Sequence, residues 1–207
     1  MEVKKVPVSI YAEITPNPAV MKFVANQLLI EQDSVEFKNI DEAKPSPLAQ
    51  KLFHFPFVKE VFISGNYIAI SKYDIAEWQD VTLELRNFIS EWLQEGKPVL
   101  TEKVATHSGS EEDAPVMTSV AQEVDPTNLS EVEKRIVEIL DEYVRPAVEQ
   151  DGGNIRFVSY EDKTVKVLLQ GACSGCPSST MTLKQGIQNL MQKMLPTLVD
   201  DIEAING

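Results

Sequence analysis

The first half of the chain switches between a two-residue and a helical hydrophobic period, which predicts a mixture of strands and helices. Alternation of apolar and polar residues predicts a strand over 6–12, and 34–40 has a strand-like composition. Two apolar runs flank Ser64-Gly65-Asn66, as expected for a hairpin over 58–71. Helical spacing also predicts a short helix after TPNP, with these residues on its inner side: Val20, Phe23, Val24 and Leu28.

Two further helices of the first half are indicated by residues that favour helix ends. Ser46 followed by Pro47 is a good start, because serine can cap a helix and proline suits its first position. Asp80 can cap a long amphipathic helix that closes near Gly96 and Pro98. Its expected inner residues are Leu85, Phe88, Ile89 and Trp92. Together these elements predict a small α/β domain.

The second half begins with a strong helix signal. Ser130 and Glu133 have the spacing of a capping box, and Pro146 is expected to kink the last turn. The inward positions of this helix are Leu129, Val132, Ile136, Leu140 and Val144. Strands are predicted over 155–160 and 164–169, with a later strand within 197–205. Between them, Pro177 opens a helix whose inner residues are Leu183, Ile187, Leu190, Met191 and Met194.

Residues 98–128 separate these two patterned regions. The segment is rich in Ser, Thr, Pro and acidic residues, lacks aromatic residues and shows no sustained period. Because an unstructured loop of this length is uncommon inside a compact domain, it is predicted to be an acidic, flexible linker. The fold class expected is therefore two small mixed α-β domains, α+β or α/β, over residues 1–97 and 129–207.

Composition and charge narrow the function classes. The 207 residues carry a formal net charge of -13, which disfavours binding to nucleic acid or to anionic lipid. No apolar run approaches the ~20 residues of a membrane span. The N-terminal residues have no long apolar core, no cleavage site and no Arg, so neither a secretory signal nor a transit peptide is read from them. A cytoplasmic location is the resulting expectation.

The candidate chemistry lies in GACSGCPSSTMTLKQG, residues 171–186. Cys173 and Cys176 are the two cysteines of the chain and form a Cys-x-x-Cys pair between a strand and a helix start. Unpaired N–H groups and the helix dipole favour a thiolate at a helix start, so Cys176, just before Pro177, is expected to be readily deprotonated. Hydroxyl groups that could donate hydrogen bonds to sulfur belong to Ser174, Ser178 and Ser179.

Three functions are compatible with this pair. A thiol–disulfide oxidoreductase of the thioredoxin class carries Cys-x-x-Cys at a helix start. A homodimer could combine two such loops into a four-thiolate site for zinc or an iron–sulfur cluster. A single-chain metal site would need histidine, but His54 and His107 lack ligand spacing.

Two neighbouring features have simpler structural interpretations. Gly152 and Gly153 of the DGG sequence are expected to supply positive φ for a turn. Three methionines are interpreted as core filler rather than iron ligands: Met181, Met191 and Met194.

The second half resembles a known family. EILDEYVRPAVEQDGGNIRFVSY followed by VKVLLQGACSGCPSSTMTLKQGIQNLMQ is similar to the C-terminal domain of NifU-like (Nfu-type) iron–sulfur cluster carriers, over residues 129–205. TPNP, VFISGNYIAISK and the Trp before a long helix resemble the N-terminal domain of two-domain members. The family's turn commonly reads Asp-Gly-Gly-Asp, whereas this chain has Asn154 at the fourth position.

The resemblance implies a function for the cysteine pair. Cys173 and Cys176 of two subunits would hold a labile [4Fe–4S] cluster in a cluster-dependent homodimer, with zinc as a less favoured occupant. The cluster would arrive from an upstream donor and be delivered to apo iron–sulfur proteins, so the chain would be a scaffold or carrier and not an enzyme. Counting thiolates agrees, because two chains supply the four that such a cluster takes.

Overall fold

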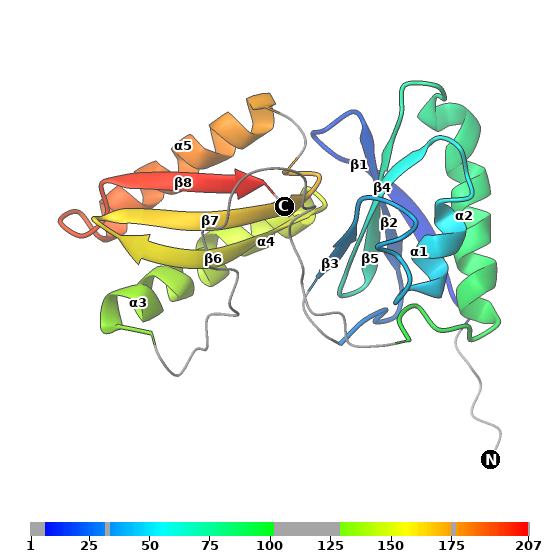
Figure 1. Ribbon diagram of the computed structural model, residues 1–207, viewed down its shortest axis with the longest axis horizontal. Coiled ribbons are helices and arrows are strands. Elements are labelled where there is room, and N and C mark those ends of the chain that lie inside the picture. Colours follow the sequence, from blue (N-terminus) through cyan, green and yellow to red (C-terminus); the bar gives the residue numbers. More distant parts are fainter. Residues whose placement is uncertain (1–6, 32–33, 102–128, 175–176, 207) are drawn as a thin grey trace, which may run out of the picture. The chain divides into compact units, whose positions relative to one another are not determined.

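A computed structural model describes residues 7–31, 34–101, 129–174 and 177–206 of the chain. The chain divides into two compact units, Met1–Ala105 and Thr106–Gly207. Each unit has its own sheet and helices (Figure 1). Each also has its own hydrophobic core. The mixed α-β fold class expected from the sequence is confirmed.

The first unit is built on a five-stranded antiparallel sheet with strand order β1-β2-β5-β4-β3. In chain order its strands are β1 (Ile10–Ile14), β2 (Val20–Ala25), β3 (Val35–Phe37), β4 (Val58–Ser64) and β5 (Tyr67–Lys72). The predicted hairpin is confirmed as β4 and β5. Its turn uses Gly65, whose φ of 48° lies in the left-handed region that glycine adopts without strain.

The short helix predicted over Val20 to Leu28 is wrong, because residues 20–25 form β2. Every residue of β2 is buried. A short run that is buried on both faces of a sheet loses the alternation that marks a strand, so its apolar positions can imitate a helical spacing. Hydrogen bonding to β1 on one side and β5 on the other holds these residues in a strand.

Two helices lie on one side of this sheet (Figure 1). Helix α1 (Pro47–Leu52) begins as predicted, with the Ser46 side chain accepting a hydrogen bond from the Ala49 N–H. Helix α2 (Trp78–Gln94) begins before the predicted cap Asp80, which lies in its first turn. The shared core of helices and sheet includes Leu48, Leu52, Leu85, Ile89, Phe23, Ile63, Ile68 and Ile70.

The packed part of the first unit extends beyond the predicted boundary at residue 97. Val99 is buried, and its carbonyl accepts a hydrogen bond of 2.7 Å from the Ser46 hydroxyl. The Thr101 N–H donates to the Pro45 carbonyl at 2.9 Å. Residues 102–128, most of the predicted linker, lie outside the described residues.

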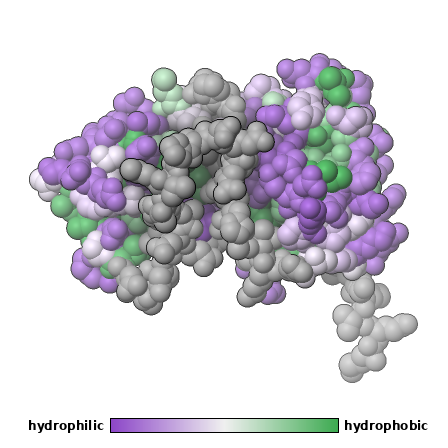
Figure 2. Space-filling model, in the orientation of Figure 1, coloured by the Kyte–Doolittle hydropathy of each residue, from purple (hydrophilic) through white to green (hydrophobic). Residues whose placement is uncertain are grey.

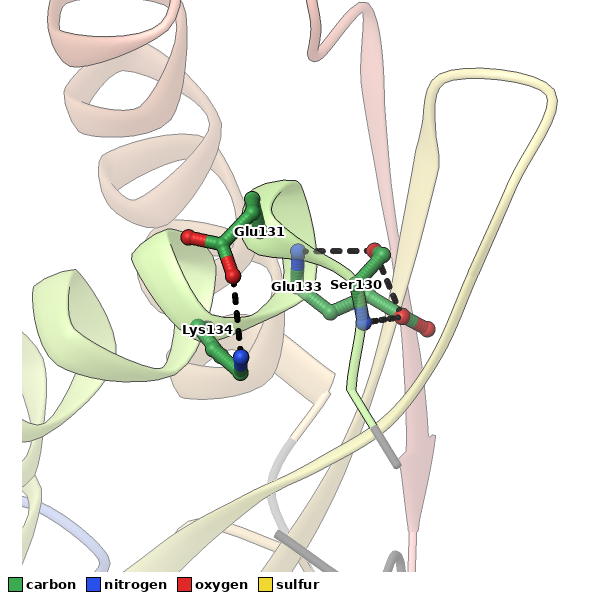
Figure 3. Close-up of polar contacts among 4 residues, drawn as sticks. All are labelled: Ser130, Glu131, Glu133 and Lys134. Atoms are coloured by element: carbon green, nitrogen blue, oxygen red, sulfur yellow. Dashed lines mark hydrogen bonds and ion pairs between the residues drawn. The ribbon is translucent and has the colours of Figure 1, made fainter. Parts of the chain in front are cut away.

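The second unit opens with three consecutive helical segments: α3 (Glu131–Ile139), the π-helical turn η1 (Leu140–Val144) and α4 (Arg145–Gln150). The predicted capping box is present (Figure 3). The Ser130 hydroxyl accepts from the Glu133 N–H, and the Glu133 carboxylate accepts from the Ser130 N–H at 2.8 Å. Two otherwise unpaired N–H groups of the helix start are thereby satisfied.

The disturbance expected at Pro146 takes the form of the π turn. Proline has no N–H, and its ring would clash with the carbonyl four residues earlier in a regular helix. The N–H of the preceding Arg145 bonds instead to the Leu140 carbonyl, five residues back. The helical path is therefore widened before Pro146 and continues through α4.

The remaining elements form a three-stranded sheet and one long helix. Strands β6 (Gly153–Glu161) and β7 (Thr164–Gly171) are an antiparallel hairpin, and β8 (Asp201–Asn206) pairs parallel to β7. The hairpin turn contains Asp162 and Lys163, both at positive φ. Helix α5 (Pro177–Met194) connects β7 to β8, so the predicted helix start and last strand are confirmed. Ile187 and Met191 of α5 are buried in the core.

The visible surface of both units is mostly hydrophilic, with hydrophobic residues in small groups (Figure 2). Among the described residues, no helix has the length and apolar character needed to cross a membrane.

Removal of the capping box is expected to weaken the second unit. We predict that Ser130→Ala lowers the free energy of unfolding of this unit by about 1 kcal/mol, because the first turn loses a hydrogen-bonded cap. Lys134→Ala is the control. It removes the exposed ion pair of Lys134 with Glu131, 2.9 Å, and should cost at most about 0.5 kcal/mol. Denaturant unfolding of both variants measures the difference, and equal costs would contradict the role given to the cap.

Candidate metal centre

Cys173 lies in the loop that joins the end of β7 to the start of α5. Its side chain is only 7% exposed and belongs to the hydrophobic core of the second unit, together with Ile155, Leu169 and Ile187. Cys176, the other predicted ligand, lies outside the described residues. Helix α5 begins at Pro177, directly after it, as the sequence predicted.

The backbone of the loop is tied to the elements on either side. Gly171 has a φ of 66°, and its carbonyl accepts from both the N–H and the hydroxyl of Ser174, at 3.1 and 2.9 Å. The Ala172 N–H donates to the Gly152 carbonyl at 3.2 Å. The Thr180 hydroxyl, in the first turn of α5, donates to the Cys173 carbonyl at 3.0 Å. These bonds fix the path of residues 171–174 against the hairpin and α5.

Two expectations for hydroxyl groups near the cysteines need revision. The Ser174 hydroxyl was expected to donate to sulfur, but it donates to the Gly171 carbonyl because that oxygen lies within the same tight turn. The side chains of Ser178 and Ser179 are outside the described set. Thr180 was missed by sequence reasoning, although its place in the first turn after Pro177 is where a short hydroxyl can reach back to a preceding carbonyl.

The two glycines of the DGG sequence serve different purposes. Gly152 has a φ of 83°, as predicted for a turn after the helix. The positive φ expected at Gly153 is wrong, because Gly153 is the first residue of β6 and has extended backbone. Its role is to leave space. A β-carbon there would lie 2.8 Å from the Cys173 Sγ and 2.7 Å from the Gln170 carbonyl oxygen. Residue 153 must therefore be glycine for Cys173 to occupy its observed position.

Asn154, where the family commonly has aspartate, lies in β6 and not in the turn. It is buried, it faces Gln170 across the hairpin, and its Oδ1 accepts from the Ile155 N–H at 2.8 Å. A neutral amide thus occupies this buried position beside the cysteine loop.

The thiolate expected at Cys176 falls outside the described residues, so only the protonation of Cys173 is described. Burial, and secondly the negative charge of Asp151, raises the pKa of the Cys173 thiol from 9.0 to about 11. Because desolvation favours the neutral form, the thiol of Cys173 is protonated at neutral pH. A metal bound there must displace this proton.

The described residues contain no group of three or more His, Cys, Asp and Glu side chains that could hold a metal ion. His54 lies in the first unit, where its Nδ1–H donates to the Gln50 carbonyl at 2.7 Å, and His107 is outside the described residues. Of the methionines expected in the core, Met191 is fully buried and Met194 packs against the core. Met181 is 73% exposed, so its assignment to the core is wrong: it points outward from the first turns of α5.

Comparison with known proteins agrees with the resemblance seen in the sequence. The family described as "Scaffold protein Nfu/NifU N terminal" matches residues 10–96, and the "NifU-like domain" family matches residues 136–200. The chain belongs to the two-domain Nfu-type family. These matches fall one in each compact unit, so each unit corresponds to one domain of the family.

Relatives are similar to this chain over almost its whole length, and two of them serve as examples. The proteins named "NFU1 iron-sulfur cluster scaffold homolog, mitochondrial" from Drosophila willistoni and Drosophila sechellia are each 36% identical over 197 residues, 95% of this chain. The chain spans 63% and 64% of their lengths. Among solved structures, a NifU-like protein from Saccharomyces cerevisiae is 24% identical, covering 50% of this chain and 92% of that chain with a TM-score of 0.43.

The cytoplasmic location expected from the sequence is wrong on this comparison, since these relatives are named as mitochondrial. The expectation rested on reading no targeting segment in the N-terminal residues. A transit peptide is separate from the folded domains, so the compartment cannot be predicted from the residues that form the fold.

The raised pKa of Cys173 predicts a pH-dependent contribution to stability. Well below pH 9 the thiol is protonated in both the folded and the unfolded chain. As the pH rises from 9 towards 11, the unfolded thiol ionises first, so the contribution of burying the thiol is progressively lost. We therefore expect the stability advantage of Cys173 over Cys173→Ala, both in a Cys176→Ser background, to shrink between pH 8.5 and 11. Denaturant unfolding at each pH measures it, and two parallel curves would contradict the assignment.

Proposed function

We propose that this chain is an iron–sulfur cluster scaffold or carrier. Cys173 and Cys176 of two copies hold a [4Fe–4S] cluster as cargo, which an upstream donor supplies and apo iron–sulfur proteins receive. The observation that carries the proposal is the cysteine loop itself, anchored between β7 and α5 within the unit that matches the NifU-like domain. The names of the relatives, which are iron–sulfur cluster scaffold homologues, support it.

The number of ligands requires a second copy. A [4Fe–4S] cluster takes four thiolates, and one chain has two cysteines. Among the described residues, no cluster of other ligating side chains could complete the site. A symmetric pair of loops supplies the missing two thiolates, and separation of the copies removes half of the ligands at once. This arrangement suits a protein that must release what it holds.

A thiol–disulfide oxidoreductase is the alternative from another class. Its attacking cysteine is activated by a lowered pKa, whereas burial raises the pKa of Cys173 to about 11. Zinc binding by the same four thiolates is the second alternative. Anaerobic purification and reconstitution separate the three functions. A brown protein with iron and sulfide supports the carrier, and a colourless protein that reduces insulin supports the oxidoreductase. Zinc in the purified protein supports the zinc site.

We assign the cluster to the second unit, residues 129–207, which contains both cysteines. We further place this function in mitochondria, the compartment named for the relatives. The role does not require a catalysed reaction, because the cluster is bound and passed on without chemical change.

Loss of either cysteine is expected to abolish stable cluster binding. Cys173→Ser or Cys176→Ser leaves two thiolates in a dimer that needs four, and serine is a poor ligand for a soft metal site. Iron and sulfide content after anaerobic reconstitution measures the loss. Met181→Leu is the matched control, since this exposed sulfur lies close by in α5 and should not matter. Full iron and sulfide content in a single cysteine variant would refute the four-thiolate bridge.

Association of the chain is expected to depend on the cluster. The apo protein should be monomeric, and the loaded protein should be a dimer with one cluster per two chains, because a ligand that needs two copies drives their association. The net charge of -13 opposes association, and salt screens this repulsion over about 8–10 Å. Analytical ultracentrifugation with iron measured in each species tests this. A monomer that carries a complete cluster would contradict it.

A further inference from the structure

The Cys173 side chain occupies the space that a side chain at residue 153 would fill. Its Sγ lies 2.8 Å, and its β-carbon 3.1 Å, from the position of a β-carbon added to Gly153. Cys173 is 7% exposed and forms part of the hydrophobic core with Ile155 and Ile187. The thiol is therefore packed into its own domain, against bare backbone of β6.

This position conflicts with the proposed ligand role. A cluster shared by two copies must be reached by each thiolate from outside the domain, yet almost none of Cys173 is accessible. We infer that the bare backbone of Gly153 is a seat that stores the Cys173 thiol in the cluster-free protein, and that loading requires the thiol to leave it. The inference rests on the proposed function and makes Gly153 a positioning residue, acting through Cys173.

The geometry of the loop indicates which motion releases the thiol. The backbone around Cys173 is held by the Thr180 hydroxyl at its carbonyl and by the bonds of Ser174 to Gly171. With the backbone held, the torsion about the Cα–Cβ bond remains, and its staggered alternatives carry Sγ away from Gly153. The Thr180 bond restrains any larger opening of the loop away from α5.

Such a seat has two consequences for a carrier. A buried thiol is protected from oxidation while no cluster is bound, because oxidation requires access and thiolate character. Storage also competes with the loaded state. Only chains with the thiol turned outward can bind the cluster, so the apparent affinity falls as this fraction becomes smaller. The seat therefore favours release of the cargo.

Alkylation of the apo protein tests the seat without a cluster. In a full-length Cys176→Ser background, iodoacetamide reports on Cys173 alone. Gly153→Ala fills the seat, and we expect alkylation at least about tenfold faster than in the parent, since the buried state no longer protects the sulfur. Gly186→Ala is the matched control, because a β-carbon there meets no atom within 4 Å. An unchanged or slower rate in Gly153→Ala would overturn the inference.

Cluster loading then distinguishes a storage position from a ligand position. With both cysteines present, Gly153→Ala should take up cluster from ferrous iron and sulfide faster than the parent and lose it to a chelator more slowly. Faster alkylation combined with loss of cluster binding would mean that the seat is the ligand position, and the inference would be wrong. If the parent chain itself takes up no cluster, the proposed function fails while the alkylation result still decides whether the seat exists.

A second variant covers the risk that Gly153→Ala disturbs the hairpin, since its β-carbon would also lie 2.7 Å from the Gln170 carbonyl oxygen. Thr180→Val keeps the shape of the side chain, leaves the strands untouched and removes the bond to the Cys173 carbonyl. It should raise the alkylation rate in the same direction, by a smaller factor, with an unchanged thermal midpoint. If Gly153→Ala does not fold, the Cys176→Ser parent itself decides: alkylation of its Cys173 as fast as in the same chain unfolded in denaturant would refute the inference.

Discussion

The pairing of Gly153 with Gly171 at the open end of the β6–β7 hairpin fixes where the cysteine loop lies. This register brings the turn after α4 beside the loop after β7, so that the Ala172 N–H reaches the Gly152 carbonyl. Because neither paired residue has a side chain, the loop can approach β6 closely enough for the Cys173 sulfur to contact its backbone. The bond from the Thr180 hydroxyl to the Cys173 carbonyl ties the same loop to the first turn of α5.

Two physical effects act in opposite directions on the cysteine pair. The start of α5 favours negative charge, which was the basis for expecting a thiolate. Burial and the neighbouring Asp151 oppose it at Cys173, and the pKa there rises. Desolvation prevails because it acts on the whole sulfur atom, whereas the partial charge of a helix end decreases within its first turn. The Cys173 side chain is therefore a neutral, buried thiol at neutral pH.

The sequence predicts correctly those elements whose conformation depends on residues that are neighbours in the chain. The capping box at Ser130, the helix starts at Pro47 and Pro177 and the turn at Gly65 each depend on a few neighbouring residues, and each was predicted. The β2 strand was mistaken for a helix because its identity depends on neighbours on both sides. In the candidate site, the chain order placed the cysteines between a strand and a helix. The burial of Cys173 and the space at Gly153 could not be foreseen, because both arise from a contact between residues twenty positions apart.

The π turn before Pro146 explains the spacing of core residues along the consecutive segments α3, η1 and α4. Ile136, Leu140, Val144 and Val148 are all buried and follow one another at intervals of four. In a regular α-helix of 3.6 residues per turn, twelve residues would rotate the last of these about 120° away from the first. One extra residue accommodated in a wide turn reduces this drift to roughly 20°, so that all four face the same core. Four core residues at unbroken four-residue intervals therefore cannot all face one side of a regular α-helix. They can do so when the segment that they span contains one widened turn.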